Sequence, residues 1–326
     1  MSSLRVTMVC MACFVAASAL AAVPQPVLEW DVNTSWDPAT GRVLNSGSVA
    51  NAGALEGRPG NYAYWSDPPS YESKLSDEDN DPNRFAAPQY VAAGDDSRAY
   101  LNFENYGWLE ALGPAYTKGS SYNGTPIFDG AVGYTEVGYF YVASDFFALQ
   151  NAGLGAGHGT SWQDMFLYST RGRTFYSATV MSGPVYKEDA GEWVTERWTL
   201  GGVGVNAMND VNSIIPRDQW FQFVKVHDIA AQQVRYYVDG ELVLTLDYDD
   251  DLTGFAYSGT GSESIGRFGT DYRCIQGFGF SYLAAYDCVL TDAQILESYA
   301  YLTGIPEPAT MTLLALGGLA LLRRRR

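Results

Sequence analysis

The segment from Trp220 to Leu246 constrains the fold of this chain more than any other part of the sequence. Apolar and polar residues alternate from Trp220 to His227, and a second run, Val234 to Val238, follows after a turn. Asp239-Gly240 then leads directly into a third run, Glu241 to Leu246. Asp-Gly between two apolar runs favours a two-residue type I′ turn, because both residues of that turn need a positive φ. The sequence therefore predicts three consecutive antiparallel strands here.

Other segments show similar alternation and predict further strands. The expected strands are Leu28–Val32, Ala99–Phe103, Thr135–Val142, Gln163–Ser169, Thr174–Ala178 and Gly277–Tyr286. The turn Thr170–Arg173 would join the fourth and fifth of them as a hairpin. One short helix is expected near the end, where Thr291 and Gln294 form a capping box ahead of an apolar face. Regular turn spacing without long amphipathic helices favours an all-β sandwich.

Several of these segments resemble the laminin G-like domains of the concanavalin A-like lectin/glucanase superfamily. The residues that carry the resemblance are Trp220, Tyr237–Gly240, Ile265-Gly266 and Tyr286–Ile295. It extends from about Ala99 to Leu302 and is vague before about residue 98. The resemblance implies a two-sheet antiparallel jelly-roll sandwich with one short C-terminal helix, variable loops and, in many members, a calcium ion at one rim. We expect this domain to span residues 23–304.

The N-terminal residues 1–22 have the pattern of a cleavable export signal. Arg5 gives a positive start, Val6–Leu20 is largely apolar, and small residues precede an expected cleavage close to Ala22. A retained membrane anchor is one alternative, but the apolar run is shorter than the ~20 residues that span a bilayer. A lipoprotein signal at Cys13 is another, although it would use only the first part of the apolar stretch.

The C-terminal residues 305–326 combine three features in a fixed order. Pro306-Glu307-Pro308 blocks helix continuation and leaves an extended, protease-accessible stretch. The apolar run Ala309–Leu322 follows and ends against four arginines, which favour the cytoplasmic side of a membrane. This order resembles the PEP-CTERM sorting signal, which implies processing by a membrane-embedded exosortase in bacteria that make exopolysaccharide. An ordinary tail anchor would explain the apolar run and the arginines but not Pro-Glu-Pro.

The two ends together predict where the protein goes. We expect an exported protein at the cell surface or in the extracellular matrix of a Gram-negative-type bacterium. Both termini would contact the inner membrane only transiently, during export and processing.

The acidic balance of the chain limits its partners. The formal net charge is −17, and removal of both ends would take away five arginines and one glutamate, leaving about −21. Such a surface repels nucleic-acid phosphates and favours divalent cations. Nucleic-acid binding is therefore excluded.

Two cysteines would remain after export. Cys10 and Cys13 would leave with the signal, whereas Cys274 and Cys288 would stay. An even pair in an oxidising compartment predicts a Cys274–Cys288 disulfide. Two buried free thiols are the alternative.

The sequence contains no pattern that catalysis on this fold requires. Retaining glucanases need two carboxylates roughly 5 Å apart, and alternate strand residues share a face, so the expected pattern is Glu-x-Asp-x-Glu. The acidic run Glu188–Glu192 lies in a Pro/Gly-framed segment and is interpreted as a solvated turn. Only His158 and His227 are available as bases, and His227 ends a predicted core strand, which favours a structural role. We therefore name no catalytic residue.

One glycine-rich segment is a candidate ligand loop. His158 lies within Gly153–Gly159 and is followed by Trp162. The segment lacks the strand-to-helix context of a phosphate site, so a nucleotide is not the expected ligand. Sugar recognition would need exposed aromatic faces, although aromatic residues equally fill sandwich cores. By number alone the candidates are Trp65, Tyr71, Trp108, Trp162, Trp193 and Trp198.

Acidic residues in predicted loops are candidate calcium ligands. Asp77, Asp79 and Asp81 alternate in the proline-rich surface loop expected between Ser66 and Pro88, and hard oxygen ligands of this kind suit Ca²⁺. Calcium is the cofactor that this pattern predicts. Solvated acidic turns are the alternative, both here and at Asp249–Asp251.

The sequence as a whole favours an exported, non-catalytic binding or adhesion protein that recognises a glycan or the exopolysaccharide matrix. A polysaccharide-active enzyme on the same fold, either a glycoside hydrolase or a lyase, is the first alternative. A purely structural surface protein is the second.

Overall fold

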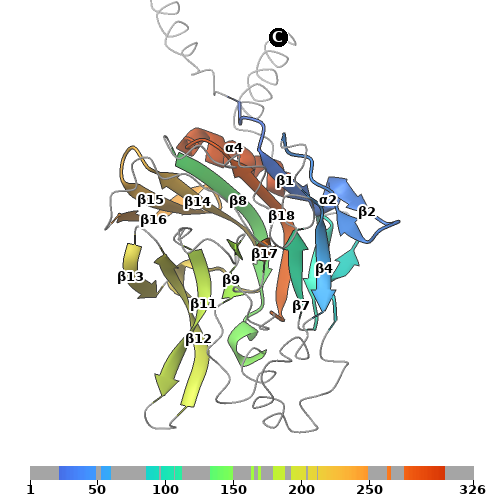
Figure 1. Ribbon diagram of the computed structural model, residues 1–326, viewed down its shortest axis with the longest axis horizontal. Coiled ribbons are helices and arrows are strands. Elements are labelled where there is room, and N and C mark those ends of the chain that lie inside the picture. The colour runs from blue at the N-terminus through green and yellow to red at the C-terminus, as the bar shows by residue number, and fades with distance from the viewer. Residues whose placement is uncertain are drawn as a thin grey trace, which may run out of the picture. The chain divides into compact units, whose positions relative to one another are not determined.

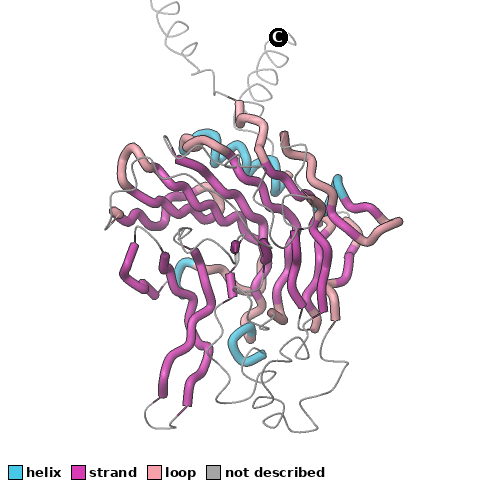
Figure 2. Tube along the Cα trace, viewed as in Figure 1, coloured by secondary structure: helices cyan, strands magenta, loops and turns pink. Residues whose placement is uncertain are grey.

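The structure is a computed structural model whose described residues form two units. The described residues are 22–48, 53–59, 86–94, 97–105, 107–111, 133–149, 163–164, 168–169, 179–187, 192–202, 205–210, 212–248, 263–265 and 275–304. One unit comprises Gln25–Leu290, and the other comprises Met1–Pro24 together with Thr291–Arg326. Strands dominate the described part of the first unit (Figure 2).

The largest sheet contains eight described strands in antiparallel pairs. Its order is β16 (Glu241–Asp247), β15 (Gln233–Val238), β14 (Trp220–Asp228), β8 (Gly133–Val142), β18 (Phe278–Tyr286), β6 (Tyr100–Phe103) and β5 (Gln89–Val91), and β1 (Leu28–Asp31) also pairs with β18. The last of the described strands, β18, lies between β8 and β6 in this order, and Figure 1 shows it beside β8. It brings strands from distant parts of the sequence into one sheet.

The hairpin predicted at Asp239-Gly240 is confirmed. The two residues have φ angles of 51° and 81°, and β15 and β16 pair on either side of them. The Asp239 carboxylate accepts a hydrogen bond from the Gln222 backbone N–H at 2.9 Å. The turn is thereby tied to β14, and the three predicted strands form as expected.

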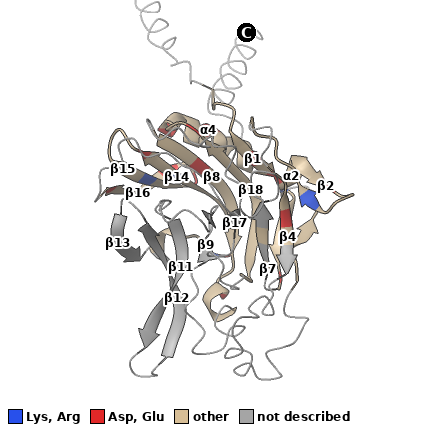
Figure 3. Ribbon diagram, in the orientation of Figure 1, with Lys and Arg blue, Asp and Glu red and all other residues tan. Residues whose placement is uncertain are grey.

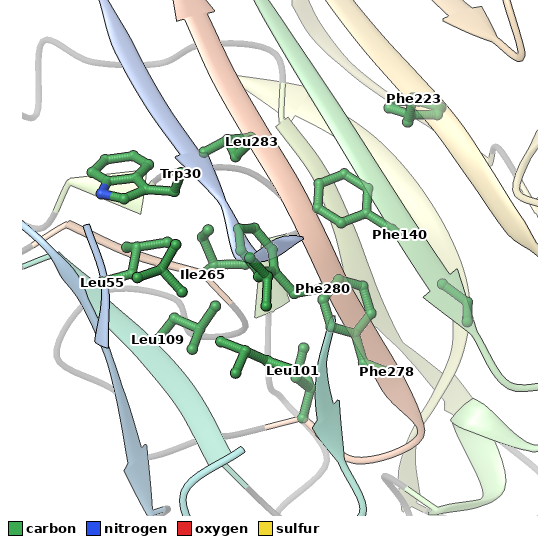
Figure 4. Packing of buried hydrophobic residues seen from close by; sticks show 14 of the residues in the cluster. Trp30, Leu55, Leu101, Leu109, Phe140, Phe223, Ile265, Phe278, Phe280 and Leu283 are labelled. Atoms are coloured by element: carbon green, nitrogen blue, oxygen red, sulfur yellow. The ribbon is translucent and has the colours of Figure 1, made fainter. Parts of the chain in front are cut away.

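The second sheet faces the first across the hydrophobic core. Its described strands run in the order β10 (Tyr168–Ser169), β17 (Glu263–Ile265), β7 (Gly107–Ala111), β4 (Leu55–Pro59), β3 (Arg42–Val43) and β2 (Trp36–Asp37). Side chains of both sheets share one cluster and are at most 2% exposed; they include Leu55, Leu109 and Ile265 on one side and Leu101, Phe278 and Phe280 on the other (Figure 4). The predicted all-β sandwich of antiparallel sheets is confirmed.

A third sheet was not predicted. Its described strands are β13 (Val205–Asp210), β12 (Glu192–Gly202), β11 (Thr179–Lys187) and β9 (Gln163–Asp164), in that order. The single strand expected at Gln163–Ser169 is wrong, because β9 pairs with β11 whereas β10 pairs with β17 of the second sheet. Its expected hairpin partner, Thr174–Ala178, lies outside the described residues. The bounds of β9 and β10 therefore depend on the strands with which they pair and not on the alternation of their own residues.

The N-terminal part, where the resemblance was vague, contributes to both sheets. Trp30 on β1 is fully buried, and its indole N–H donates to a backbone carbonyl at 2.9 Å. The strand expected at Leu28–Val32 ends one residue early because Asp31 caps the one-turn helix α2 (Val32–Ser35). The Asp31 carboxylate accepts from the Asn33 backbone N–H at 2.9 Å.

A stacked aromatic pair joins the edges of the two sheets. Trp36 lies on β2, at the edge of the second sheet, and Tyr90 lies on β5, at the edge of the first. Their ring centroids are 4.6 Å apart and the ring planes differ by 6°. Tyr90 is 38% exposed, so this contact lies at the surface.

The described part of the second unit is mainly the helix α4 (Asp292–Thr303). The predicted capping box is confirmed: the Thr291 hydroxyl accepts from the Gln294 backbone N–H at 3.3 Å, and the Gln294 side chain accepts from the Thr291 N–H at 3.0 Å. The helix ends at Gly304, whose φ of 68° is left-handed. Among the residues that the structure describes, none of the helices is long and apolar enough to span a membrane.

Of the two cysteines expected to form a disulfide, Cys288 is described, and it is a free thiol in this structure. Its side chain is half-buried, and this burial raises the pKa of the thiol. The expected partner, Cys274, lies outside the described residues. The Cys274–Cys288 pairing therefore stays a prediction.

Candidate binding surface

Four aromatic side chains gather on the outer face of the first sheet, opposite the core. Tyr139 and Tyr141 of β8 lie on this face, because Phe140 between them points into the core and successive strand residues alternate. Trp220 begins β14 directly opposite Tyr141, and Tyr100 begins β6. We call Tyr100, Tyr139, Tyr141 and Trp220 the aromatic platform.

Trp220 is the centre of the aromatic platform. Its ring centroid lies 5.5 Å from that of Tyr139 with an interplanar angle of 22°, and 5.9 Å from that of Tyr141 with an angle of 49°. Tyr100 meets it edge-on at 5.0 Å. All four side chains are partly exposed. The surface therefore offers both ring area and three phenolic hydroxyls to a ligand.

Gly279 of β18 makes room for the indole of Trp220. In the sheet, Gly279 lies opposite Tyr141 on one side and Asn102 on the other. A Cβ at this position would lie 2.9 Å from the Cη2 atom of Trp220 and 3.1 Å from the Cβ of Tyr141. The indole reaches across β18 to Tyr100 because residue 279 has no side chain.

Asp218 brings negative charge to the β14 end of the aromatic platform. Its carboxylate accepts from the Ser144 backbone N–H at 2.8 Å and lies 3.4 Å from the Tyr141 hydroxyl. The hydrogen bonds from Ser144 lower the pKa of Asp218, so this exposed carboxyl is ionised at neutral pH. Burial raises the pKa of the Tyr141 hydroxyl, and the charges of Asp218 and Asp145 raise it further. The carboxylates thus act electrostatically on the platform itself.

Polar groups also flank the β6 side of the platform. Asn102, beside Gly279 in the sheet, donates from its Nδ2 to the Glu104 carboxylate at 3.1 Å. Glu104 is exposed. The rings are therefore bordered by hydrogen-bonding side chains on both sides.

A second polar cluster lies on the inner face of the same sheet. Lys225 on β14 and Glu136 on β8 are cross-strand neighbours, and their Nζ and Oε2 atoms are 2.5 Å apart. His227 stacks on Tyr134 with ring centroids 4.4 Å apart, and its Nδ1 lies 2.6 Å from the Tyr248 hydroxyl. Other charged residues lie along the described strands as well, among them the Arg42–Glu56 pair of β3 and β4 (Figure 3).

The inner cluster is buried and its imidazole is neutral. Lys225, Glu136 and His227 are each at most 4% exposed. Burial lowers the pKa of His227 well below its ordinary value, and the charge of Lys225 lowers it further. Because a ligand cannot reach such side chains without rearrangement, the outer face provides the candidate site.

Most of the sequence-predicted site residues lie outside the described part of the chain. They are His158 and Trp162 of the candidate ligand loop, Asp77, Asp79, Asp81 and Asp249–Asp251 of the acidic segments, and Pro306, Glu307 and Pro308 of the tail. Ala22 is described and exposed, and its carbonyl accepts from Gln294 Nε2 at 3.2 Å. Within the described ranges, no group of three His, Cys, Asp or Glu side chains is placed to hold a metal ion.

The aromatic platform was not predicted from the sequence. Trp220 was interpreted as a marker of the fold, and other tryptophans were the candidate sugar contacts. The signal that was available is the pair Tyr139 and Tyr141, two residues apart on a predicted strand. With Phe140 in the core, this spacing directs both tyrosines outward.

The C-terminus shows how the chain is sorted. Residues 304–326 match the family model for the PEP-CTERM protein-sorting motif. The chain ends in this sorting signal. A PEP-CTERM motif indicates an exported bacterial protein that is anchored in the membrane or held at the cell surface, and it implies processing by an exosortase.

Several solved β-sandwich structures are similar to this chain. The binding domain of botulinum neurotoxin DC in complex with rat synaptotagmin II is 11% identical over 85% of this chain and 52% of that chain, with a TM-score of 0.45. The botulinum neurotoxin serotype D ligand-binding domain with N-acetylneuraminic acid is 9% identical over 85% and 51%, with a TM-score of 0.47. This chain spans about half the length of these neurotoxin domains.

Domain 4 of AbnA, a GH43 extracellular arabinanase from Geobacillus stearothermophilus, was solved with arabinotriose. It is 13% identical over 84% of this chain and 97% of that chain, with a TM-score of 0.42. Likeness at this level is general to β-sandwiches and does not extend to a ligand. No curated protein matches the sequence.

Proposed function

We propose that this protein is a non-catalytic glycan-binding or adhesion protein of the bacterial surface, with the aromatic platform as its sugar contact. The observation that carries the proposal is the cluster of four partly exposed rings around Trp220 on an outer sheet face. Export under a PEP-CTERM signal supports it, because a surface protein meets polysaccharide there.

The chemistry of the aromatic platform suits a sugar. Tyr and Trp provide rigid side chains with an apolar ring and a polar tip. The C–H groups of a sugar ring pack on aromatic faces, while its hydroxyls need hydrogen-bonding partners at the ring edges. Asp218 supplies an acceptor at one side, and Asn102 supplies an amide at the other. A sugar ring stacked on Trp220 could therefore form hydrogen bonds with Asp218 on one side and with Asn102 on the other.

Several finer points belong to the same proposal. We assign the sandwich to the laminin G-like jelly rolls and its ligand to the exopolysaccharide matrix of a Gram-negative-type bacterium. We also propose Ca²⁺ at Asp77, Asp79 and Asp81, because alternating carboxylates in one loop suit this ion.

A glycan array followed by calorimetry tests the proposal. The purified protein should bind at least one glycan, and Trp220→Ala should weaken that binding about tenfold, as loss of a central aromatic contact does. Tyr90→Ala removes a partly exposed ring on the edge strand β5, where Tyr90 pairs with the core residue Leu101 rather than with the platform, and is the matched control; circular dichroism checks that both variants fold. A chelator added to the same array tests calcium.

Three outcomes would count against the proposal. The wild-type protein could bind no glycan, or Trp220→Ala and Tyr90→Ala could behave alike. Release of reducing ends from a polysaccharide by the purified protein would contradict the non-catalytic part.

A further inference from the structure

We infer that the aromatic platform selects saccharides without negative charge and binds those with a free amino group most tightly. This inference rests on the proposed glycan-binding function and deepens it. It follows from the charges placed around the rings.

Two carboxylates act on the β14 end of the aromatic platform. Asp218 lies 3.4 Å from the Tyr141 hydroxyl and is held there by the Ser144 backbone N–H. Asp145 is exposed, one residue beyond Ser144. Burial raises the pKa of Tyr141, and the charges of Asp218 and Asp145 act in the same direction. A ligand on these rings meets a negative field from this side.

A third carboxylate lies on the β6 side. Asn102 is the sheet neighbour of Gly279, the residue over which Trp220 lies, and its amide holds the Glu104 carboxylate at 3.1 Å. Glu104 is exposed, so its charge faces solvent beside the rings. Negative charge therefore flanks the aromatic platform at both sides.

The described cations nearby only partly offset these carboxylates. Arg217, next to Asp218 in the sequence, lies with its guanidinium carbon 4.7 Å from the ring centroid of Phe147. Lys225 is buried on the opposite face of the sheet in its pair with Glu136. Arg98, two residues before Tyr100, is paired with Asp31 at 2.6 Å. Among the described residues, Arg217 is therefore the cation that stands against Asp218, Asp145 and Glu104, and the local balance stays negative.

This charge pattern has a direct chemical consequence. A uronate or sulfated sugar stacked on Trp220 would bring an anion towards carboxylates of the same sign. An ammonium group at the same place would be attracted both by Asp218 and by the faces of the aromatic rings. Neutral sugars would experience neither effect and would bind with intermediate affinity.

Calorimetry at low salt with three oligosaccharides tests this order. The probes are hexameric N-acetylglucosamine, its de-N-acetylated form and hexameric galacturonate. We expect the amino hexamer to bind about fivefold more tightly than the neutral one, and galacturonate to bind more weakly than either. In roughly 1 M salt, where screening acts within about 3 Å, the amino and neutral hexamers should converge.

Asp218→Asn is the decisive variant. Asparagine tolerates the φ of 55° at this position, and its amide oxygen can still accept from Ser144. We expect the preference for the amino hexamer to fall at least about twofold, as expected for loss of one nearby charge. Asp287→Asn makes the same charge change at the far end of β18 and should leave the preference unchanged.

The outcomes separate this inference from the proposed function. If the protein binds glycans on the array, two results would overturn the inference and leave the proposed function standing. Galacturonate could bind as tightly as the neutral hexamer or more tightly, or the amino hexamer could fail to bind. An unchanged preference in Asp218→Asn would also overturn it. No glycan binding of any kind would overturn both.

Discussion

Lys225 and His227 lie on β14, where every second side chain points to the inner face of the sheet. They share that face with Phe221 and Phe223. A charge at such a position is costly unless a partner neutralises it. The register of β14 and β8 places Glu136 directly opposite Lys225, and the two form the buried ion pair. The inner face thus changes from aromatic to polar along a single strand.

His227 links the stability of the protein to pH. Its pKa in the folded state is well below the ordinary 6.5, so above pH 6.5 the imidazole is neutral in both the folded and the unfolded chain. Below that pH the unfolded chain binds a proton that the folded protein does not. We expect the free energy of unfolding to fall by up to about 1.4 kcal/mol per pH unit until the folded-state pKa is reached.

Urea unfolding between about pH 8 and pH 5 measures this effect when wild type is compared with His227→Gln. The glutamine amide retains a partner for the Tyr248 hydroxyl, and all other titrating groups are common to the two proteins. The stability difference between them should shrink or reverse as the pH falls. A difference that stays constant over this range would show that His227 is not the linked group.

Among the elements, the β15–β16 hairpin depends most directly on its turn. Gly240 has a φ of 81°, which an L side chain adopts only with strain, so Gly240→Ala should lower the free energy of unfolding by about 1 kcal/mol. Asp239→Asn is the control, because asparagine suits the turn and can still accept from the Gln222 N–H. Equilibrium unfolding of both variants checks this, and equal losses would argue against turn strain as the cause.

Elements specified by neighbouring residues were predictable from the sequence. The hairpin at Asp239-Gly240 and the cap at Thr291 each depend on a few adjacent residues. Elements defined by distant pairing were not. The segment Gln163–Ser169 divides between two sheets because its partners are β11 and β17, and neither partner can be inferred from its own alternation.

The aromatic platform was unpredictable for the same reason. Tyr139 and Tyr141 were visible as an outward pair, but Tyr100 joins them only because β18 lies between β6 and β8. Gly279 has no side chain and so lets Trp220 cross β18. This role cannot be inferred until the order of the strands is known. Local patterns therefore predicted the strands, whereas the residues of the site lie together because of the order of the strands in the sheet.

At the scale of the whole molecule, the sorting tail gives its own prediction. Replacing Pro306-Glu307-Pro308 by three alanines should prevent exosortase processing, because it removes the Pro-Glu-Pro of the matched sorting motif. Intact-mass spectrometry of the protein from its host should then find the tail retained. Alanine at Thr310 and Thr312 leaves the order of motif, apolar run and arginines unchanged and should be processed normally. Equal processing of both variants would contradict the prediction.

The position of β18 has a mechanical consequence. The strand runs from Gly279, beneath Trp220, to Tyr286, and from there the chain continues towards its sorting tail. A pull applied between Gly279 and Tyr286 would load this strand along its length. Its hydrogen bonds to β8, β6 and β1 run across that direction, so the pull shears many of them at once instead of opening them one by one. A load on β18 is therefore shared among its pairings with three neighbouring strands.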